Sequence, residues 1–200
     1  VLMPTRTIQD PPFARFLFDN TASAWIWLLA RIYLGWQWLQ AGWHKVTDPA
    51  WMNGGTALKG FWTRAVAIPD PPAKPAIAYG WYRDFLSALL EGGHYTWFGK
   101  LIAVGEVIVG VALILGLLTG FAAFAGAFMN FNFMLAGSAS TNPVLFVLAV
   151  LLLMAWKVAG YWGVDRYLLP ALGTPWDRSP AGPERYEPEP VSRPEERPRV

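Results

Sequence analysis

The chain has 200 residues, of which 54% are hydrophobic and only 15% are charged, and its net charge is +2. A soluble protein carries about 25% charged residues, so this composition excludes a soluble enzyme and predicts a protein that resides in a lipid bilayer. The sequence contains no cysteine, which excludes disulfides, thiolate metal sites and Cys-bound iron–sulfur clusters. Arginines near the C-terminus alternate with Glu and Pro, so no basic surface for nucleic acid is assembled.

Four apolar stretches predict four transmembrane helices, because about 20 residues of helix cross the roughly 30 Å of hydrocarbon. The spans are expected at residues 24–42, 98–118, 119–137 and 143–163. The second and third spans are joined by a short glycine-containing hinge, so they must form an antiparallel hairpin. The predicted fold class is therefore an all-α membrane protein, a four-helix bundle with both chain ends on one side of the membrane.

Three further segments flank or connect these spans. Residues 1–23 are interrupted by prolines and have no signal-peptide core, so we expect the first span to be retained as an anchor. The long loop, residues 45–97, is predicted to contain helices that lie in the membrane interface. Within it, residues 76–90 place apolar side chains on one stripe, and this stripe fits either a cap over the bundle end or a role in gating a site. The stripe consists of Ile77, Trp81, Phe85 and Leu89.

The C-terminal segment, residues 164–200, is rich in Pro, Glu and Arg from Gly173 onward and has few apolar side chains to bury. It is expected not to fold alone and to lie against other protein subunits of a membrane complex.

Eight Lys and Arg residues flank the spans on the side of the termini, against six on the side of the long loop. This excess predicts that the termini lie in the cytoplasm. The membrane is expected to be the inner membrane of a bacterial or archaeal cell.

Two charged residues lie deep inside the predicted spans. Arg31 is about 11 Å and Glu106 about 18 Å below the surface on the side of the termini, a difference that an Arg side chain can cover. Each charge alone would cost several kcal/mol in the bilayer, so we predict an ion pair between Arg31 and Glu106, the candidate catalytic residues. Lys157 is close enough to the end of its helix to reach the lipid headgroups.

Polar side chains also indicate candidate ligand-binding residues. Asn130 and Asn132 are two residues apart in the third span, so one of them is expected to point into the bundle, either as an interhelical hydrogen bond or toward a ligand. His44 and Lys45 lie at the mouth of the bundle. The two histidines, His44 and His94, are at the water boundary, and no span contains a Glu-x-x-His pair, so neither a haem nor a metal site is expected.

Small residues predict where the helices pack closely. They are Gly35 and Gly42 on the first helix, Gly99, Ala103 and Gly110 on the second, and Ala122 and Gly126 on the third.

Two segments, ARIYLGWQWLQAGWHKVTDPAW and GKLIAVGEVIVGVALILGLLTGFAA, resemble the DoxX/DoxD family of small four-helix membrane proteins. The resemblance covers about residues 24–163, and the long first loop is closer to the DoxD-like members. The family takes its name from the membrane part of a thiosulfate:quinone oxidoreductase, and other members are associated with thiol or sulfur redox complexes. The elements that match are Arg31, Gly35, Gly42, Lys45, Asp48-Pro49, Gly105-Glu106, Gly110 and Gly116.

The resemblance leaves two functions open. In the first, the chain is the membrane subunit of an oxidoreductase that couples thiosulfate, thiol or sulfur oxidation to quinone reduction, with Glu106 as proton carrier. In the second, it is a non-catalytic structural subunit of a respiratory or photosynthetic complex that packs on lipid, carotenoid or a neighbouring protein. A cavity beside Glu106 that is open to lipid favours quinone binding, whereas a dry, filled ion pair favours the structural role.

Overall fold

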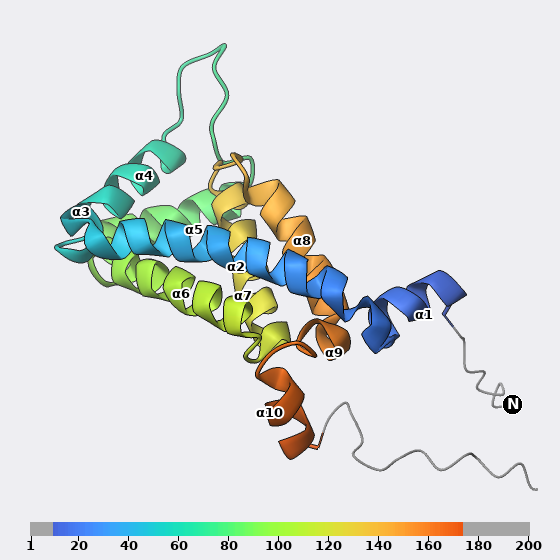
Figure 1. The fold of residues 1–200 in the computed structure, drawn as a ribbon. Coiled ribbons are helices and arrows are strands. Elements are labelled where there is room, and N and C mark those ends of the chain that lie inside the picture. Colours follow the sequence, from blue (N-terminus) through green and yellow to red (C-terminus); the bar gives the residue numbers. More distant parts are fainter. Residues whose placement is uncertain (1–9, 174–200) are drawn as a thin grey trace, which may run out of the picture.

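The structure is a computed structural model that describes residues 10–173, and this part of the chain is all-helical, with no strand (Figure 1). The predicted partner contacts of the tail beyond residue 173 lie outside the described residues. The elements in chain order are α1 (Pro12–Asp19), the short 3-10 helix η1 (Thr21–Ser23), α2 (Ala24–Thr47), α3 (Pro49–Met52), α4 (Thr56–Val66), α5 (Gly80–Glu91), α6 (Tyr95–Leu115), α7 (Thr119–Leu135), α8 (Asn142–Met154), α9 (Trp156–Ala159) and α10 (Asp165–Ala171).

Each of the four predicted apolar segments is helical. The first helix, α2, continues five residues beyond its expected end at Gly42 and stops before Asp48-Pro49, because proline disfavours helical geometry in the preceding residue. The second helix, α6, ends at Gly116, whose left-handed φ of 66° suits glycine. The predicted fourth segment is divided into α8 and α9 by a break at Ala155.

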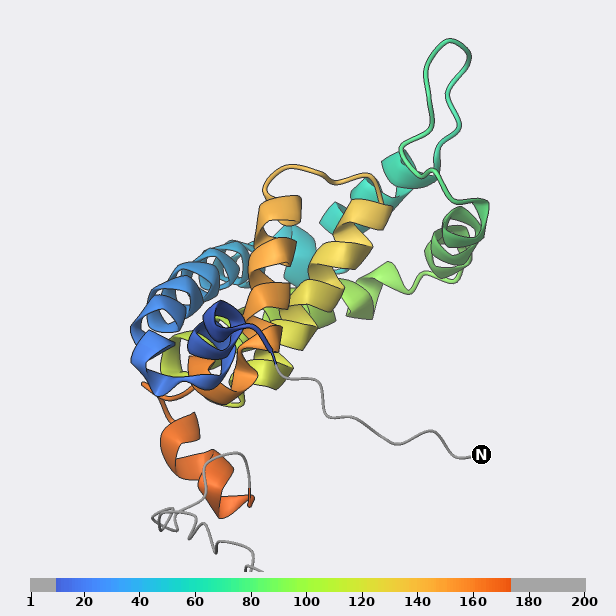
Figure 2. The same ribbon diagram turned by 90° about the vertical axis from the view of Figure 1, so that its right-hand side faces the viewer.

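The helices pack around one apolar core. The most extensive contact joins α2 to α6, and α7 packs along α8, as Figure 2 shows. A Cβ atom added to Gly42 would lie 2.6 Å from the backbone nitrogen of Val107, and one added to Gly110 would lie 2.5 Å from that of Leu39. The close packing predicted from these small residues is therefore confirmed. The fully buried core side chains include Leu34, Leu113, Ala123, Ala149 and Leu152.

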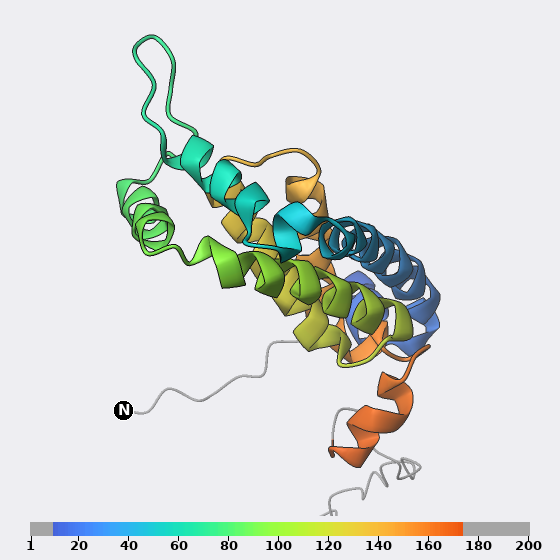
Figure 3. The same ribbon diagram turned by 90° about the vertical axis from the view of Figure 1, so that its left-hand side faces the viewer.

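A second apolar cluster forms where α4 and α5 fold over one end of the bundle (Figure 3). Its buried side chains include Leu58 and Trp62 of α4 and Tyr82 and Leu86 of α5. The predicted helix on residues 76–90 begins only at Gly80, so the buried Ile77 precedes it. Trp81 and Phe85 remain on one face of α5, and this face is exposed instead of packing on the bundle.

The opposite end of the bundle carries both ends of the described chain. Figure 1 shows α10 next to the turn between α6 and α7, and α1 beyond the start of α2, on the side of α9. The Asp165 carboxylate accepts hydrogen bonds from the backbone N–H groups of Leu118 (2.6 Å) and Thr119 (2.8 Å), and so caps α7. Lys157 is partly exposed at this end and forms an ion pair with Asp19 at 2.7 Å.

By length and composition one helix of the described residues, α6, is long and apolar enough to cross a membrane. The remaining bundle helices are shorter, as in α7 with 17 residues and α8 with 13, or carry more polar side chains, as in α2.

Candidate functional site

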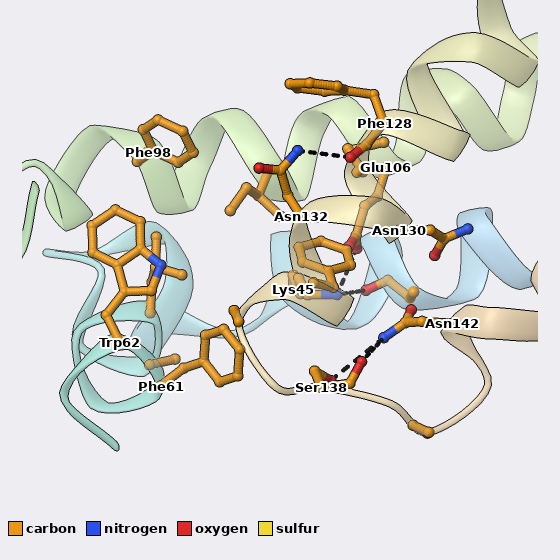
Figure 4. Close-up of a pocket in the computed structure, with 18 of the residues that line it drawn as sticks. Lys45, Phe61, Trp62, Phe98, Glu106, Phe128, Asn130, Asn132, Ser138 and Asn142 are labelled. Atoms are coloured by element: carbon orange, nitrogen blue, oxygen red, sulfur yellow. Dashed lines mark hydrogen bonds and ion pairs between the residues drawn. The ribbon is translucent and has the colours of Figure 1, made fainter. Parts of the chain in front are cut away.

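A cavity of about 670 Å³ lies at the end of the bundle that is covered by α4 and α5 (Figure 4). Its volume falls within the range of small-molecule binding pockets. The walls are mainly aromatic and aliphatic, with polar groups at a few positions. The apolar walls include Trp38, Trp51, Phe61, Trp62, Phe85, Leu86, Phe98, Ile102, Phe128, Met129 and Phe133, and the polar side chains include Gln37, Lys45, Arg64, Glu106, Asn130, Asn132, Ser138 and Asn142.

An ion pair between Lys45 and Glu106 borders this cavity. Lys45 Nζ donates to Glu106 Oε2 at 2.6 Å, and the side chain of Glu106 is 1% exposed while that of Lys45 is 21% exposed. The close approach of α2 and α6 at Gly42 makes this contact possible, because Lys45 lies one turn after that glycine. The lysine can therefore link the buried carboxylate to the water-accessible end of the bundle.

The predicted ion pair between Arg31 and Glu106 was wrong. Arg31 is buried at the opposite end of the bundle, where Nη1 donates to the carbonyl of Ala159 (3.0 Å) and Nη2 to that of Trp162 (2.8 Å). A Cβ atom on Gly116 would collide with this guanidinium group. Backbone carbonyls near the end of α9 thus pair with both Nη groups, whereas the buried Nε has no partner among the described residues. Arg31 does not border the cavity.

Asn130 and Asn132 face different surroundings, as their spacing predicted. Asn130 is 0% exposed and borders the cavity, and neither its amide nitrogen nor its amide oxygen has a hydrogen-bond partner within the described part of the chain. Asn132 donates to the carbonyl of Phe128 at 2.8 Å and accepts from the Tyr82 hydroxyl at 3.2 Å. Asn130 is therefore the asparagine that points into the bundle.

The Trp38 side chain, although mainly apolar, contributes one polar N–H group to the cavity wall, and the sequence analysis did not identify it. Its indole Nε1 is buried and, among residues 10–173, has no hydrogen-bond partner. With 12 tryptophans in the chain, nothing in the sequence singled this one out. The available signal was Gly126, since a Cβ atom there would lie 3.0 Å from Trp38 Nε1.

His44 does not border the cavity, although it was expected to contribute to ligand binding. It precedes Lys45 on α2, and a step of one residue turns the side chain by about 100° around a helix. The His44 side chain is consequently exposed.

Burial raises the pKa of Tyr82, which does border the cavity, so its hydroxyl stays protonated and serves as a donor to Asn132 at neutral pH.

Comparison with known protein families shows to which family the chain belongs. A family model described as DoxX matches residues 26–139. The chain belongs to the DoxX family. It is thus a DoxX family membrane protein, and the matched region contains Lys45, Glu106 and Asn130. Neither the curated proteins nor the solved structures compared with this DoxX protein gave a match.

Proposed function

We propose that this DoxX protein is the membrane subunit of a quinone-linked oxidoreductase and that the cavity beside Glu106 binds the quinone head group. The observation that carries the proposal is that the Lys45–Glu106 ion pair borders a cavity of about 670 Å³ instead of a filled interior. Quinone carbonyl groups need hydrogen-bond donors, whereas the ring and the isoprenoid tail need apolar walls. The cavity offers both kinds of surface.

The side chains around the cavity fit such a ligand chemically. The Lys45 ammonium group carries three N–H donors, of which one donates to the Glu106 carboxylate at 2.6 Å and a second to the Ala41 carbonyl at 3.5 Å, so that one remains for a ligand. The Asn130 amide adds two donors and an acceptor that are unpaired among the described residues. A bound quinone would supply two-electron redox chemistry. The electrons are proposed to come from a partner subunit that oxidises thiosulfate or another thiol or sulfur compound.

The residues of the chain would then bind, orient and protonate the ligand. Lys45 holds a carbonyl oxygen through a free N–H, and Glu106 holds or releases a proton at its carboxylate as the ligand changes redox state. The burial of Glu106 keeps water away from this proton, and the partly exposed Lys45 provides the path to the aqueous side. Two protons accompany the two electrons that reduce a quinone, so a proton relay is required at the site.

The same proposal includes the arrangement in the membrane. We infer that α2, α6, α7 and the α8–α9 pair cross the bilayer, and that α3 to α5 lie in the interface over the cavity. The outward faces support this arrangement, because large apolar side chains cover them. They include Leu29, Ile32, Ile108, Phe121, Phe124, Val147 and Leu151. The ends of the described chain are placed in the cytoplasm of a bacterial or archaeal cell.

Binding of a short-chain benzoquinone to the full-length protein in lipid nanodiscs tests the proposal. The wild-type protein should bind saturably. Lys45→Met should weaken binding about 10- to 150-fold, because one hydrogen bond to a charged group contributes about 1.5–3 kcal/mol. Glu106→Gln should also weaken binding, because the carboxylate that holds the Lys45 ammonium group is lost. Glu91→Gln, which makes the same chemical change at an exposed position on α5, should bind like the wild type. Absence of saturable binding by the wild type would overturn the proposal.

One observation favours the structural alternative. A row of phenylalanines runs along the exposed face of α7, and the rings of Phe124 and Phe128 stack with centroids 6.5 Å apart. Such a face would fit a carotenoid or a neighbouring subunit in a respiratory or photosynthetic complex. Native purification followed by identification of co-migrating proteins and pigments tests it. Co-purification of a carotenoid, with wild-type assembly in Glu106→Gln, would support the structural role.

A further inference from the structure

Two polar side chains beside the cavity are buried without a hydrogen-bond partner in the described part of the chain. They are Trp38, which is 3% exposed and has an unpaired Nε1, and Asn130, which is 0% exposed and has an unpaired amide. Each buried group left unsatisfied costs about 1–3 kcal/mol. Native proteins rarely retain such groups without a partner, a water molecule or a ligand.

The Trp38 indole of α2 packs against α7 at Gly126, four residues before Asn130. Gly126 leaves room for the indole, whose Nε1 would lie 3.0 Å from a Cβ atom at that position. Asn130 follows one helical turn later and therefore lies on the same face of α7. Both Trp38 and Asn130 also border the cavity. The unpaired donors thus come from two helices that meet at one wall of the cavity.

This wall lies deeper in the bundle than the ion pair. Trp38 is seven residues before Lys45 on α2, which corresponds to two turns and about 10 Å along the helix axis. The cavity consequently has two sets of donors at two levels. The upper set is cationic and consists of Lys45, and the lower set is neutral and consists of the Trp38 indole and the Asn130 amide.

We propose that Trp38 Nε1 and Asn130 Nδ2 bind a second carbonyl oxygen of the ligand, so that the cavity selects a ring with two carbonyl groups. One carbonyl oxygen faces Lys45 and the other faces Trp38 and Asn130. This inference rests on the proposed quinone site and adds the orientation of the head group within it. The lower donors are neutral, so they suit a carbonyl oxygen and not a carboxylate or phosphate, which would call for cationic partners.

The two lower residues should respond differently to the redox state of the ligand. An indole N–H can only donate, and a carbonyl oxygen is a stronger acceptor than a phenolic hydroxyl oxygen, so the indole pairs more strongly with the oxidised form of the ligand. An asparagine amide can both donate and accept, so it can also pair with the hydroxyl of the reduced form. Trp38 therefore increases the preference for the oxidised ligand, while Asn130 supports both forms.

The experiment measures the affinities of a short-chain benzoquinone and its hydroquinone for the full-length protein in nanodiscs, without oxygen. Trp38→Phe keeps an aromatic ring beside Phe133 but removes the donor. It should weaken quinone binding about 3- to 10-fold, as expected for one neutral hydrogen bond, and should weaken hydroquinone binding less. Asn130→Leu should weaken both. Trp43→Phe, an exposed position on the same helix, serves as the control and should change neither.

A second measurement needs no variant. The infrared difference spectrum is recorded for the wild-type protein with quinone labelled at its carbonyl carbons. Both carbonyl bands should lie at lower frequency than in the same labelled quinone free of protein, because both oxygens accept hydrogen bonds. Quinone binding that weakens in Lys45→Met but is unchanged in Trp38→Phe and Asn130→Leu would overturn this inference and leave the proposed function intact. One unshifted carbonyl band would also overturn it. A wild-type protein that binds no quinone would overturn the proposed function itself.

Discussion

Lys45 and Glu106 form an ion pair at 2.6 Å although 61 residues separate them and they lie on different helices. The contact depends on the glycine-lined packing of α2 against α6, which brings the last turns of α2 over the middle of α6. Glu106 is buried, whereas Lys45 is partly accessible. The pair therefore connects the interior of the bundle to its surface on the side of the long loop.

Removal of Lys45 should destabilise the protein. Lys45→Met leaves the Glu106 carboxylate buried without its cation, which should lower the free energy of unfolding by up to roughly 3 kcal/mol. The double variant Lys45→Met/Glu106→Gln removes both charges and should recover much of this loss. Denaturant unfolding of the purified protein in detergent measures both effects. A double variant as unstable as Lys45→Met would contradict the pairing.

The glycine contact between α2 and α6 should tolerate no side chain. Gly42→Val would place a Cβ atom 2.6 Å from the backbone nitrogen of Val107, so the helices must separate. We expect a loss of roughly 1–3 kcal/mol, the usual cost of overpacking, together with weaker quinone binding as Lys45 moves away from Glu106. Gly80→Ala is the control, because a Cβ atom there meets nothing within 4 Å. Equal unfolding midpoints for the two variants would refute this expectation.

Asp165 should contribute to stability as the cap of α7. Its carboxylate accepts from the N–H groups of Leu118 and Thr119 and lies at the positive end of the helix dipole. Asp165→Ala should therefore cost about 1–2 kcal/mol, and Asp165→Asn should cost less because one acceptor remains. Hydrogen exchange should accelerate at these two amides. Asp84→Ala, at an exposed position on α5, should leave their exchange rates unchanged.

Tyr82 should make the stability depend on pH in the alkaline range. Burial raises its pKa above the ordinary value of 10.0, so the folded protein holds this proton more tightly than the unfolded chain does. The resulting stabilisation is fully present below pH 10 and is lost as the pH rises through the pKa of the folded state. Tyr82→Phe should flatten the fall in unfolding free energy above pH 10. An unchanged slope in this variant would show that Tyr82 does not contribute.

Several features of the site could be predicted from single residues. Glu106 and one of the two asparagines, Asn130 or Asn132, are predicted inside the bundle because polar groups are rare in apolar segments. Glu106 and Asn130 are buried at the cavity. The partner of Glu106 was not predictable from depth alone. The predicted first span ends at Gly42, whereas α2 continues to Thr47. Lys45 is therefore still part of the helix, and its side chain can point back along the helix toward the buried carboxylate of Glu106.

The sequence by itself determined the helical segments and the close packing at Gly35, Gly42 and Gly110, because apolar runs and small residues act through local geometry. Only the tertiary structure decided which groups meet. The two Nη groups of Arg31 donate to the backbone carbonyls of Ala159 and Trp162, and since every residue has a backbone carbonyl, no sequence pattern reveals these partners. The cavity likewise exists only because α4 and α5 fold back over the bundle, a long-range contact that local residue patterns do not specify.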